Sequence, residues 1–266
     1  MKTSLACYYS IGKRSKSSFP ILKFSIMPNE IILIVFYFAT LVYSIIIHEI
    51  SHGAVALWLG DITAKYAGRL TLSPWSHIDP IGSILIPLLL IPTGFAFGYA
   101  KPVPYNPYNL RDQKWGSLKV AIAGPASNFL LAFIASLLAS VTPLSLTMKH
   151  EILSRFFGVI SGRADFLDLF SALAEVIAGS FPSIFFGLFL IIIFWNVVLG
   201  CFNLIPIPPL DGSKILFTLF PVSERTQMML EQYGFFFLLF IVLFFSAPIG
   251  AFINLFLSLF LEITLW

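Results

Sequence analysis

The chain has 266 residues, of which 58% are hydrophobic and only 11% are charged, and its mean hydropathy is +0.91. This composition indicates a polytopic membrane protein and leaves little sequence for a separate soluble domain. The net charge of +3 is small, so a nucleic-acid partner is not predicted. The two cysteines, Cys7 and Cys201, are too far apart in the sequence to indicate a redox pair or a cysteine zinc site.

The first 27 residues form a basic segment without a single acid. The apolar stretch at residues 21–26 is short and contains a lysine, which argues against a signal or transit segment. We expect a disordered basic arm, or a chain that truly starts at Met27, followed by one membrane-embedded domain over residues 28–266. The basic residues of the arm are Lys2, Lys13, Arg14, Lys16 and Lys23.

A nearly unbroken apolar run covers residues 30–60 and predicts a membrane-spanning helix at about 31–59. His48, Glu49 and His52 interrupt it, and ionisable groups are expensive inside such a segment. Spacing of four residues on a helix places the two imidazoles on one face, within reach of a single zinc ion. Glu49 lies about 100° around the helix, close enough to act on a water at the metal without being a ligand. A chance match, with His48 bonding a neighbouring helix, is the alternative.

The segment between this helix and the next core helix is irregular. Residues 62–79 alternate loosely in polarity and are consistent with short strands. The apolar run 81–100 is interrupted by prolines and glycines, and the proline-rich residues 101–107 must be extended.

The rest of the chain predicts two further core helices and a final apolar segment. The core helices are expected at about 117–141 and 183–204, and the final segment at 234–262. Residues 144–182 are mixed in character, with an amphipathic patch near 164–178 that predicts an interfacial location. The sequence thus predicts an all-α polytopic membrane protein with four to five membrane helices and a re-entrant or short-strand segment between the first two core helices.

Asp211 is the best candidate for a third metal ligand, since a catalytic zinc usually has three protein ligands and one open position. It follows an apolar helix and three nearby prolines, which predict irregular backbone near membrane depth. A simple turn at the membrane boundary is the alternative reading. If Asp211 meets His48 and His52, the helices at 31–59 and 183–204 must be parallel. Residues 81–100 should then enter the membrane and return on the same side.

Basic residues favour one orientation of these helices. The side that holds residues 60–117 and 205–232 carries eight Lys and Arg when Lys119, at the start of the next helix, is counted with it, whereas the other side carries three when residues 1–27 are left out. The positive-inside rule then places the loops nearest the metal in the cytoplasm. Counting the basic arm makes the two sides equal.

Three separated motifs resemble those of the site-2 protease family of intramembrane zinc metalloproteases. They lie in the expected order over residues 30–215, and the chain resembles the compact branch without a PDZ module or C-terminal regulatory domain. The motifs are His48-Glu49-Ile50-Ser51-His52, Gly124-Pro125-Ala126-Ser127-Asn128, and Asn203 followed by Pro206, Pro208 and Asp211-Gly212.

This resemblance implies one Zn²⁺ per chain, held by His48, His52 and Asp211, with Glu49 as the catalytic acid and base. It also implies that Asn128 and Asn203 bind substrate backbone or steady the site. Residues 100–107 would resemble the membrane-edge strand of the family, which pairs with an unwound substrate.

The predicted function is hydrolysis of peptide bonds within or next to the membrane segments of protein substrates. The expected partners are a membrane-spanning protein substrate and the lipid bilayer, and the expected location is the bacterial inner membrane. A metal-ion transporter that uses the same His and Glu residues is the alternative. A transporter would be expected to carry further ligands at the same depth and a histidine-rich loop, and the chain has four histidines and no such loop.

Overall fold

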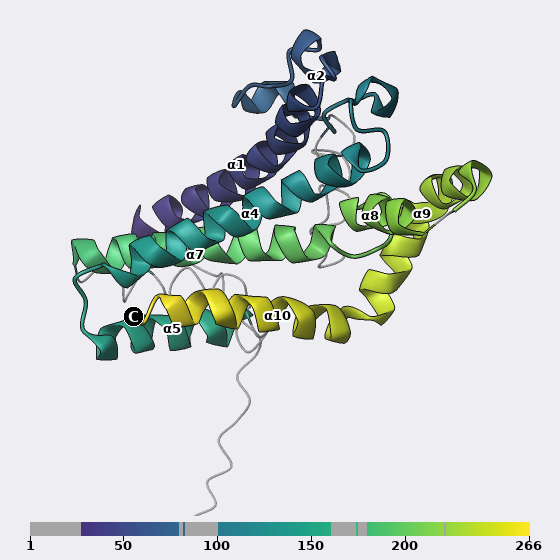
Figure 1. Ribbon diagram of the computed structural model, residues 1–266. Helices are drawn as coiled ribbons and strands as arrows, with labels where there is room; N and C mark the ends of the chain where they lie inside the picture. Colours follow the sequence, from purple (N-terminus) through teal and green to yellow (C-terminus); the bar gives the residue numbers. More distant parts are fainter. Residues whose placement is uncertain (1–27, 80–81, 83–100, 161–173, 175–179, 221) are drawn as a thin grey trace, which may run out of the picture.

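The computed structural model describes residues 28–79, 82, 101–160, 174, 180–220 and 222–266, and this part of the chain is helical without a strand (Figure 1). Five of its helices are long and apolar enough to cross a membrane. The protein is therefore an all-α polytopic membrane protein, as predicted. The long helices are α1 (Pro28–Trp58), α4 (Gly116–Ser140), α7 (Phe181–Asn203), α9 (Glu224–Phe244) and α10 (Ser246–Ile263); the shorter ones are α2 (Thr63–Tyr66), η1 (Pro74–Ser76), η4 (Pro107–Asn109), α5 (Leu146–Ile160) and α8 (Asp211–Leu219).

Helices α1, α4 and α7 form the core that positions the site. Helix α4 packs against both α1 and α7, and α1 also contacts α7. Helices α1 and α7 run in the same general direction while α4 returns between them, which confirms the predicted parallel arrangement (Figure 1). Small residues allow this close packing, because they let helix backbones approach in a membrane. The small or polar residues buried on α4 include Ala121, Gly124, Asn128, Ala132, Ala135 and Ala139.

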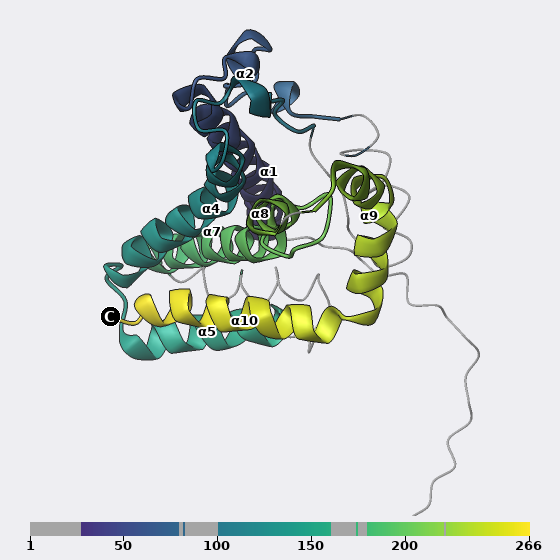
Figure 2. The same ribbon diagram turned by 45° about the vertical axis from the view of Figure 1, so that its right-hand side comes forward.

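Helices α5 and α10 form a second layer beside the core, and they lie side by side in both views (Figure 2). The apolar core continues between the layers through Phe156 of α5, Phe186 and Leu190 of α7, and Leu257 of α10. Lys149 of α5 is buried, and its ammonium group donates to the carbonyl of Ser140 at 2.7 Å and to that of Thr264 at 3.0 Å. A single cation therefore binds carbonyl groups at the C-terminal ends of two helices, α4 and α10.

The final apolar segment, expected at 234–262 without a division into helices, consists of two helices, α9 and α10. Helix α9 ends at Phe244, and α10 begins at Ser246 with Pro248 in its first turn. A proline has no amide hydrogen and cannot continue a helix from the preceding turn, whereas the first turn of a new helix tolerates it. The break therefore places Pro248 where its missing amide hydrogen costs no hydrogen bond within α10.

The connection between α1 and α4 begins and ends on the same side of the core. The amide of Arg111 donates to the carbonyl of Leu59 at 2.8 Å, and Asp61 accepts from the amide of Asn106 at 2.7 Å. The short strands expected at residues 62–79 are not formed. Asp61 also accepts from the amide and hydroxyl of Thr63, which starts the helical turn α2 instead.

Two predicted features, the re-entrant course of residues 81–100 and the amphipathic patch near 164–178, lie outside the described residues, as does the basic arm.

Candidate metal centre

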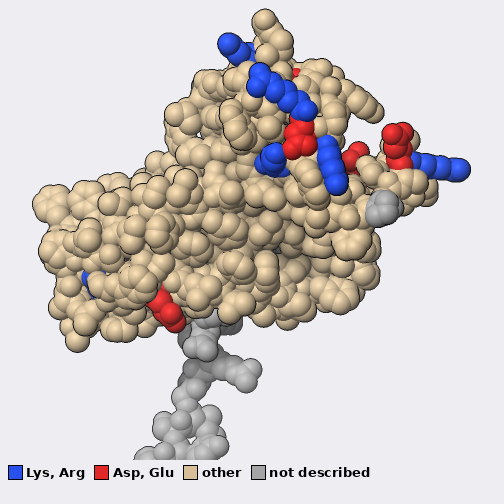
Figure 3. Space-filling model, viewed as in Figure 1, with Lys and Arg blue, Asp and Glu red and all other residues tan. Residues whose placement is uncertain are grey.

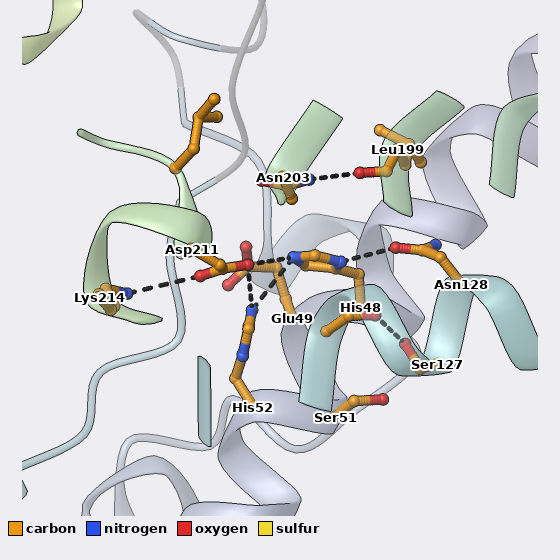
Figure 4. Close-up of polar contacts among 12 residues, drawn as sticks. His48, Glu49, Ser51, His52, Ser127, Asn128, Leu199, Asn203, Asp211 and Lys214 are labelled. Carbon is orange, nitrogen blue, oxygen red and sulfur yellow. Dashed lines mark hydrogen bonds and ion pairs between the residues drawn. The ribbon is translucent and has the colours of Figure 1, made fainter. Parts of the chain in front are cut away.

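Two imidazoles from the latter half of α1 and one carboxylate from the first residue of α8 meet at one point (Figure 4). The Nε2 atoms of His48 and His52 each lie 3.0 Å from Oδ2 of Asp211 and 3.1 Å from each other. All three residues are buried, and they form the cluster of metal-ligating type found in the described part of the chain. The structure therefore brings together the three ligands that the sequence predicted.

The chain folds tightly to deliver Asp211 to this position. Helix α7 ends at Asn203, and α8 begins at Asp211 after a proline-rich turn. A Cβ atom on Gly212 would lie within 3 Å of the carbonyl oxygens of Leu204 and Ile205, so the turn can pass over the start of α8 only where there is no side chain.

Hydrogen bonds on the far side of each imidazole determine which nitrogen faces the centre. Nδ1 of His52 lies 2.7 Å from the carbonyl oxygen of Val120, which can only accept, so this nitrogen carries the proton. Nδ1 of His48 lies 2.6 Å from Oδ1 of Asn128 and donates in the same way. Both Nε2 atoms therefore present lone pairs to each other and to the carboxylate. A metal cation among three such electron-rich atoms would bind all of them at once.

The space available at the centre fits zinc. A tetrahedral zinc with bonds of about 2.0–2.1 Å separates its ligand atoms by roughly 3.3 Å, close to the observed 3.0–3.1 Å. Gly124 leaves this space open, because a Cβ atom there would lie 2.6 Å from Nε2 of His48 and still closer to Nε2 of His52. The donor set and the cradle both suit a catalytic zinc with one open position.

Glu49 lies next to the centre without contributing to the ligand cluster. Its Oε2 atom accepts a hydrogen bond of 2.9 Å from the backbone amide of Val103, in the segment that precedes α4. On the other side of the cluster, Lys214 Nζ lies 3.6 Å from the second carboxylate oxygen of Asp211 and favours its ionised form.

The two predicted asparagines differ in their surroundings. Asn128 is completely buried, accepts from His48 and donates its own amide hydrogens inside the protein. Asn203 is partly exposed and donates to the carbonyl of Leu199 one turn earlier in α7, rather than to the ligand cluster (Figure 4).

Sequence reasoning missed Asn196 of α7, which hydrogen bonds to Asn128. A polar residue in the middle of a membrane helix was the signal that could have identified it.

Comparisons with known proteins agree with this site. Residues 36–241 match peptidase family M50. "Putative zinc metalloprotease YwhC" of Bacillus subtilis is 36% identical over 230 residues, which cover 86% of this chain and 85% of the relative. "Putative zinc metalloprotease Rip2" of Mycolicibacterium smegmatis is 28% identical over 193 residues, which cover 72% of this chain and 60% of the relative. No solved structure matches. The chain therefore belongs to peptidase family M50, the site-2 protease family, and is a zinc metalloprotease with several membrane helices.

Proposed function

We propose that the protein is an intramembrane endopeptidase, with residues 28–266 as one domain, that cleaves protein substrates within or next to their membrane-spanning segments. The observation that carries this proposal is the depth of the ligand cluster in α1. His48 lies roughly 15 Å along the helix axis from Trp58, the last residue of α1. That distance is about half the thickness of a hydrocarbon core, so a peptide bond that reaches the cluster is at membrane depth.

His48, His52 and Asp211 would hold the zinc, and the remaining position would be open to water or substrate. When bound there, zinc supplies a Lewis acid that polarises the scissile carbonyl and lowers the pKa of water toward about 7. Glu49 accepts a proton from the attacking water and passes it to the departing amine nitrogen, so that it serves first as base and then as acid.

The two asparagines have separate roles in this proposal. Both amide hydrogens of Asn128 have acceptors inside the protein and its oxygen faces His48, so we assign it to positioning that imidazole. Asn203 is partly exposed at the end of α7 and remains the candidate for binding substrate backbone.

The charge distribution supports an orientation with the site toward the cytoplasm. Lys and Arg side chains gather at the end of the molecule that holds α2 and the starts of α4 and α9, and the rest of the visible face is almost uncharged (Figure 3). Because basic loops stay on the cytoplasmic side, the ends of α1 and α7 would face the cytoplasm. The relatives are bacterial proteins, which favours the bacterial inner membrane as the location.

The test is cleavage of a doubly tagged, single-span apolar helix with a central Gly-Pro break, co-reconstituted with the full chain in liposomes. Glu49→Gln should retain about one zinc per chain and lose activity by about 10²–10⁴-fold. A Glu49→Gln protein with zinc and normal cleavage would remove Glu49 from the mechanism. Wild-type protein that cleaves soluble peptides but no membrane-inserted helix would contradict the intramembrane assignment.

A further inference from the structure

Asn196 extends the hydrogen bonding of the metal centre across all three core helices. It lies in the middle of α7, is 1% exposed, and accepts a hydrogen bond of 2.9 Å from Nδ2 of Asn128. Its own Nδ2 donates to the carbonyl of Ile192 and to the hydroxyl of Ser44, each at 2.9 Å. Ser44 lies on α1 one turn before His48, so the chain of hydrogen bonds starts at the metal ligand and returns to the helix that carries it.

Such a chain is unusual in an apolar environment. The side chains of Asn128, Asn196 and Ser44 would be costly if buried without a partner, and each of them is bound by another of the three, by a backbone carbonyl or by His48. An apolar side chain at Asn196 would pack the same helices without any polar group. The arrangement therefore indicates that the direction of the hydrogen bonds matters, and not only the contact between α4 and α7.

The direction of every bond in the chain follows from two backbone carbonyls. A carbonyl oxygen can only accept, so the bond to Ile192 orients the Asn196 amide with its oxygen toward Asn128. Nδ2 of Asn128 then faces Asn196 and the carbonyl of Ser44, at 3.3 Å, and Oδ1 of Asn128 must face His48. An asparagine can rotate its amide by 180° with little change in shape, and Asn196 removes that freedom.

We propose that Asn196, together with Ser44, is a positioning unit for the metal centre. It holds the Asn128 amide in the one orientation that accepts from Nδ1 of His48, and thereby keeps the lone pair of Nε2 directed at the metal. This inference rests on the proposed ligation of zinc by His48. Asn196 itself touches neither metal nor substrate, and its effect passes through Asn128.

The experiment measures the zinc dissociation constant of the full-length protein in detergent by competition with a chromophoric chelator. Loss of a hydrogen-bond partner behind a metal ligand typically weakens metal binding by 10- to 100-fold. We therefore expect Asn128→Ala to weaken zinc binding in that range, and Asn196→Leu by about tenfold. Because Asn196 acts through Asn128, the double variant should bind zinc no more weakly than Asn128→Ala alone.

A matched pair of serine variants separates positioning from general destabilisation. Ser44→Ala removes an acceptor of the chain, while Ser136→Ala removes another buried hydroxyl, which among the described residues bonds to the carbonyl of Ala132 in its own helix α4. Ser44→Ala should weaken zinc binding several-fold and Ser136→Ala should leave it unchanged. This pair also carries the test if Asn196→Leu does not fold.

Three outcomes would overturn the inference: wild-type affinity in Asn196→Leu, equal effects of the two serine variants, or a further loss when Asn196→Leu is added to Asn128→Ala. Any of these leaves the proposed function intact. A wild-type chain without measurable zinc affinity would instead remove the metal centre on which both rest.

Discussion

The backbone amide of Val103 donates a hydrogen bond of 2.9 Å to the carboxylate of Glu49, so the connection between α1 and α4 contacts the acidic residue that follows His48. This segment is itself held by Arg69, whose guanidinium donates to the carbonyls of Ser76, Lys101 and Pro102. Arg69 is buried, and the amide of Lys101 is bound in turn by the carbonyl of His77. The position of the Glu49 carboxylate thus depends on a residue that lies outside the site.

Arg69→Gln should lower kcat by between about 10- and 100-fold while zinc content stays near one per chain. A neutral amide cannot bridge three carbonyls, and a small displacement of a catalytic group is enough for a loss of this size. Turnover of the liposome substrate and metal analysis of the same preparation provide the two readings.

The control for this variant is Lys65→Gln, which removes a positive charge from an exposed position in the same connection and should leave turnover within twofold. Equal activity of the two variants would show that Arg69 does not position Glu49. A loss of zinc in Arg69→Gln would show that its effect is on the whole site.

Gly124→Ala should abolish zinc binding or weaken it at least 100-fold. The added methyl group would occupy the space between the imidazoles, 2.6 Å from Nε2 of His48, and the buried helices leave it no room to move. Gly250→Ala is the matched control, since it is also a helical glycine and its Cβ would meet nothing within 4 Å. Alanine favours a helix over glycine, so the control should be as stable as wild type or slightly more so. Zinc-loaded Gly124→Ala would place the metal elsewhere.

The long elements of the fold could be predicted because their apolar runs are continuous. The helices expected at 31–59, 117–141 and 183–204 are found at Pro28–Trp58, Gly116–Ser140 and Phe181–Asn203. The contact between Asp211 and the histidines was predicted from the need of a catalytic zinc for a third protein ligand, and the parallel course of the two helices followed from that contact. These features depend on the hydropathy of each segment and on the positions of the ligands along it, and both can be seen in the sequence.

The contacts that orient the site could not be predicted in the same way. The bond between Asn128 and Asn196 joins helices whose relative rotation is decided by side-chain packing. In the sequence, Arg69 looks like an ordinary basic residue of a loop. Its role depends on the carbonyls of Lys101 and Pro102, which only the folded chain brings next to it. The final apolar segment was not divided into helices in the prediction, although Pro248 could have indicated the start of α10 just after Phe245.

Protonation of Asp61 at acidic pH should destabilise the connection between α1 and α4, because the carboxylate of Asp61 accepts hydrogen bonds from it. Burial alone would raise the pKa of this carboxyl, but hydrogen bonds from Thr63, Asn109 and the amide of Asn106 outweigh it and hold the pKa below its usual value. A carboxyl with a depressed pKa stabilises the folded state fully above its unfolded pKa, and this stabilisation is lost as the pH falls through the folded pKa. Amide hydrogen exchange in residues 101–116, corrected for intrinsic rates, should therefore be slow at pH 7 and accelerate below about pH 4.

Asp61→Asn should raise this exchange at neutral pH and reduce its dependence on acid, because the amide replaces one acceptor oxygen by a donor. Asp112→Asn is the comparison: the pKa of Asp112 is also lowered, chiefly by its hydrogen bond with Lys119, but this carboxyl lies on the surface. Its replacement should change exchange little, since exposed ion pairs contribute little to stability. The same acid response in wild type and Asp61→Asn would assign the effect to another group.

Zinc should raise the thermal unfolding midpoint of the wild-type protein, and a chelator should lower it again. A ligand that binds only the folded state at 100 times its dissociation constant adds about 2.7 kcal/mol to the free energy of unfolding. Asp211→Asn keeps the shape of the side chain but removes its negative charge, so the zinc-dependent shift should largely disappear. Lys214→Gln removes the cation 3.6 Å from the same carboxylate without touching a ligand, and most of the shift should remain. A full shift in Asp211→Asn would mean that the metal is held by the histidines of α1 alone, and α7 and α8 would then have no part in the metal centre.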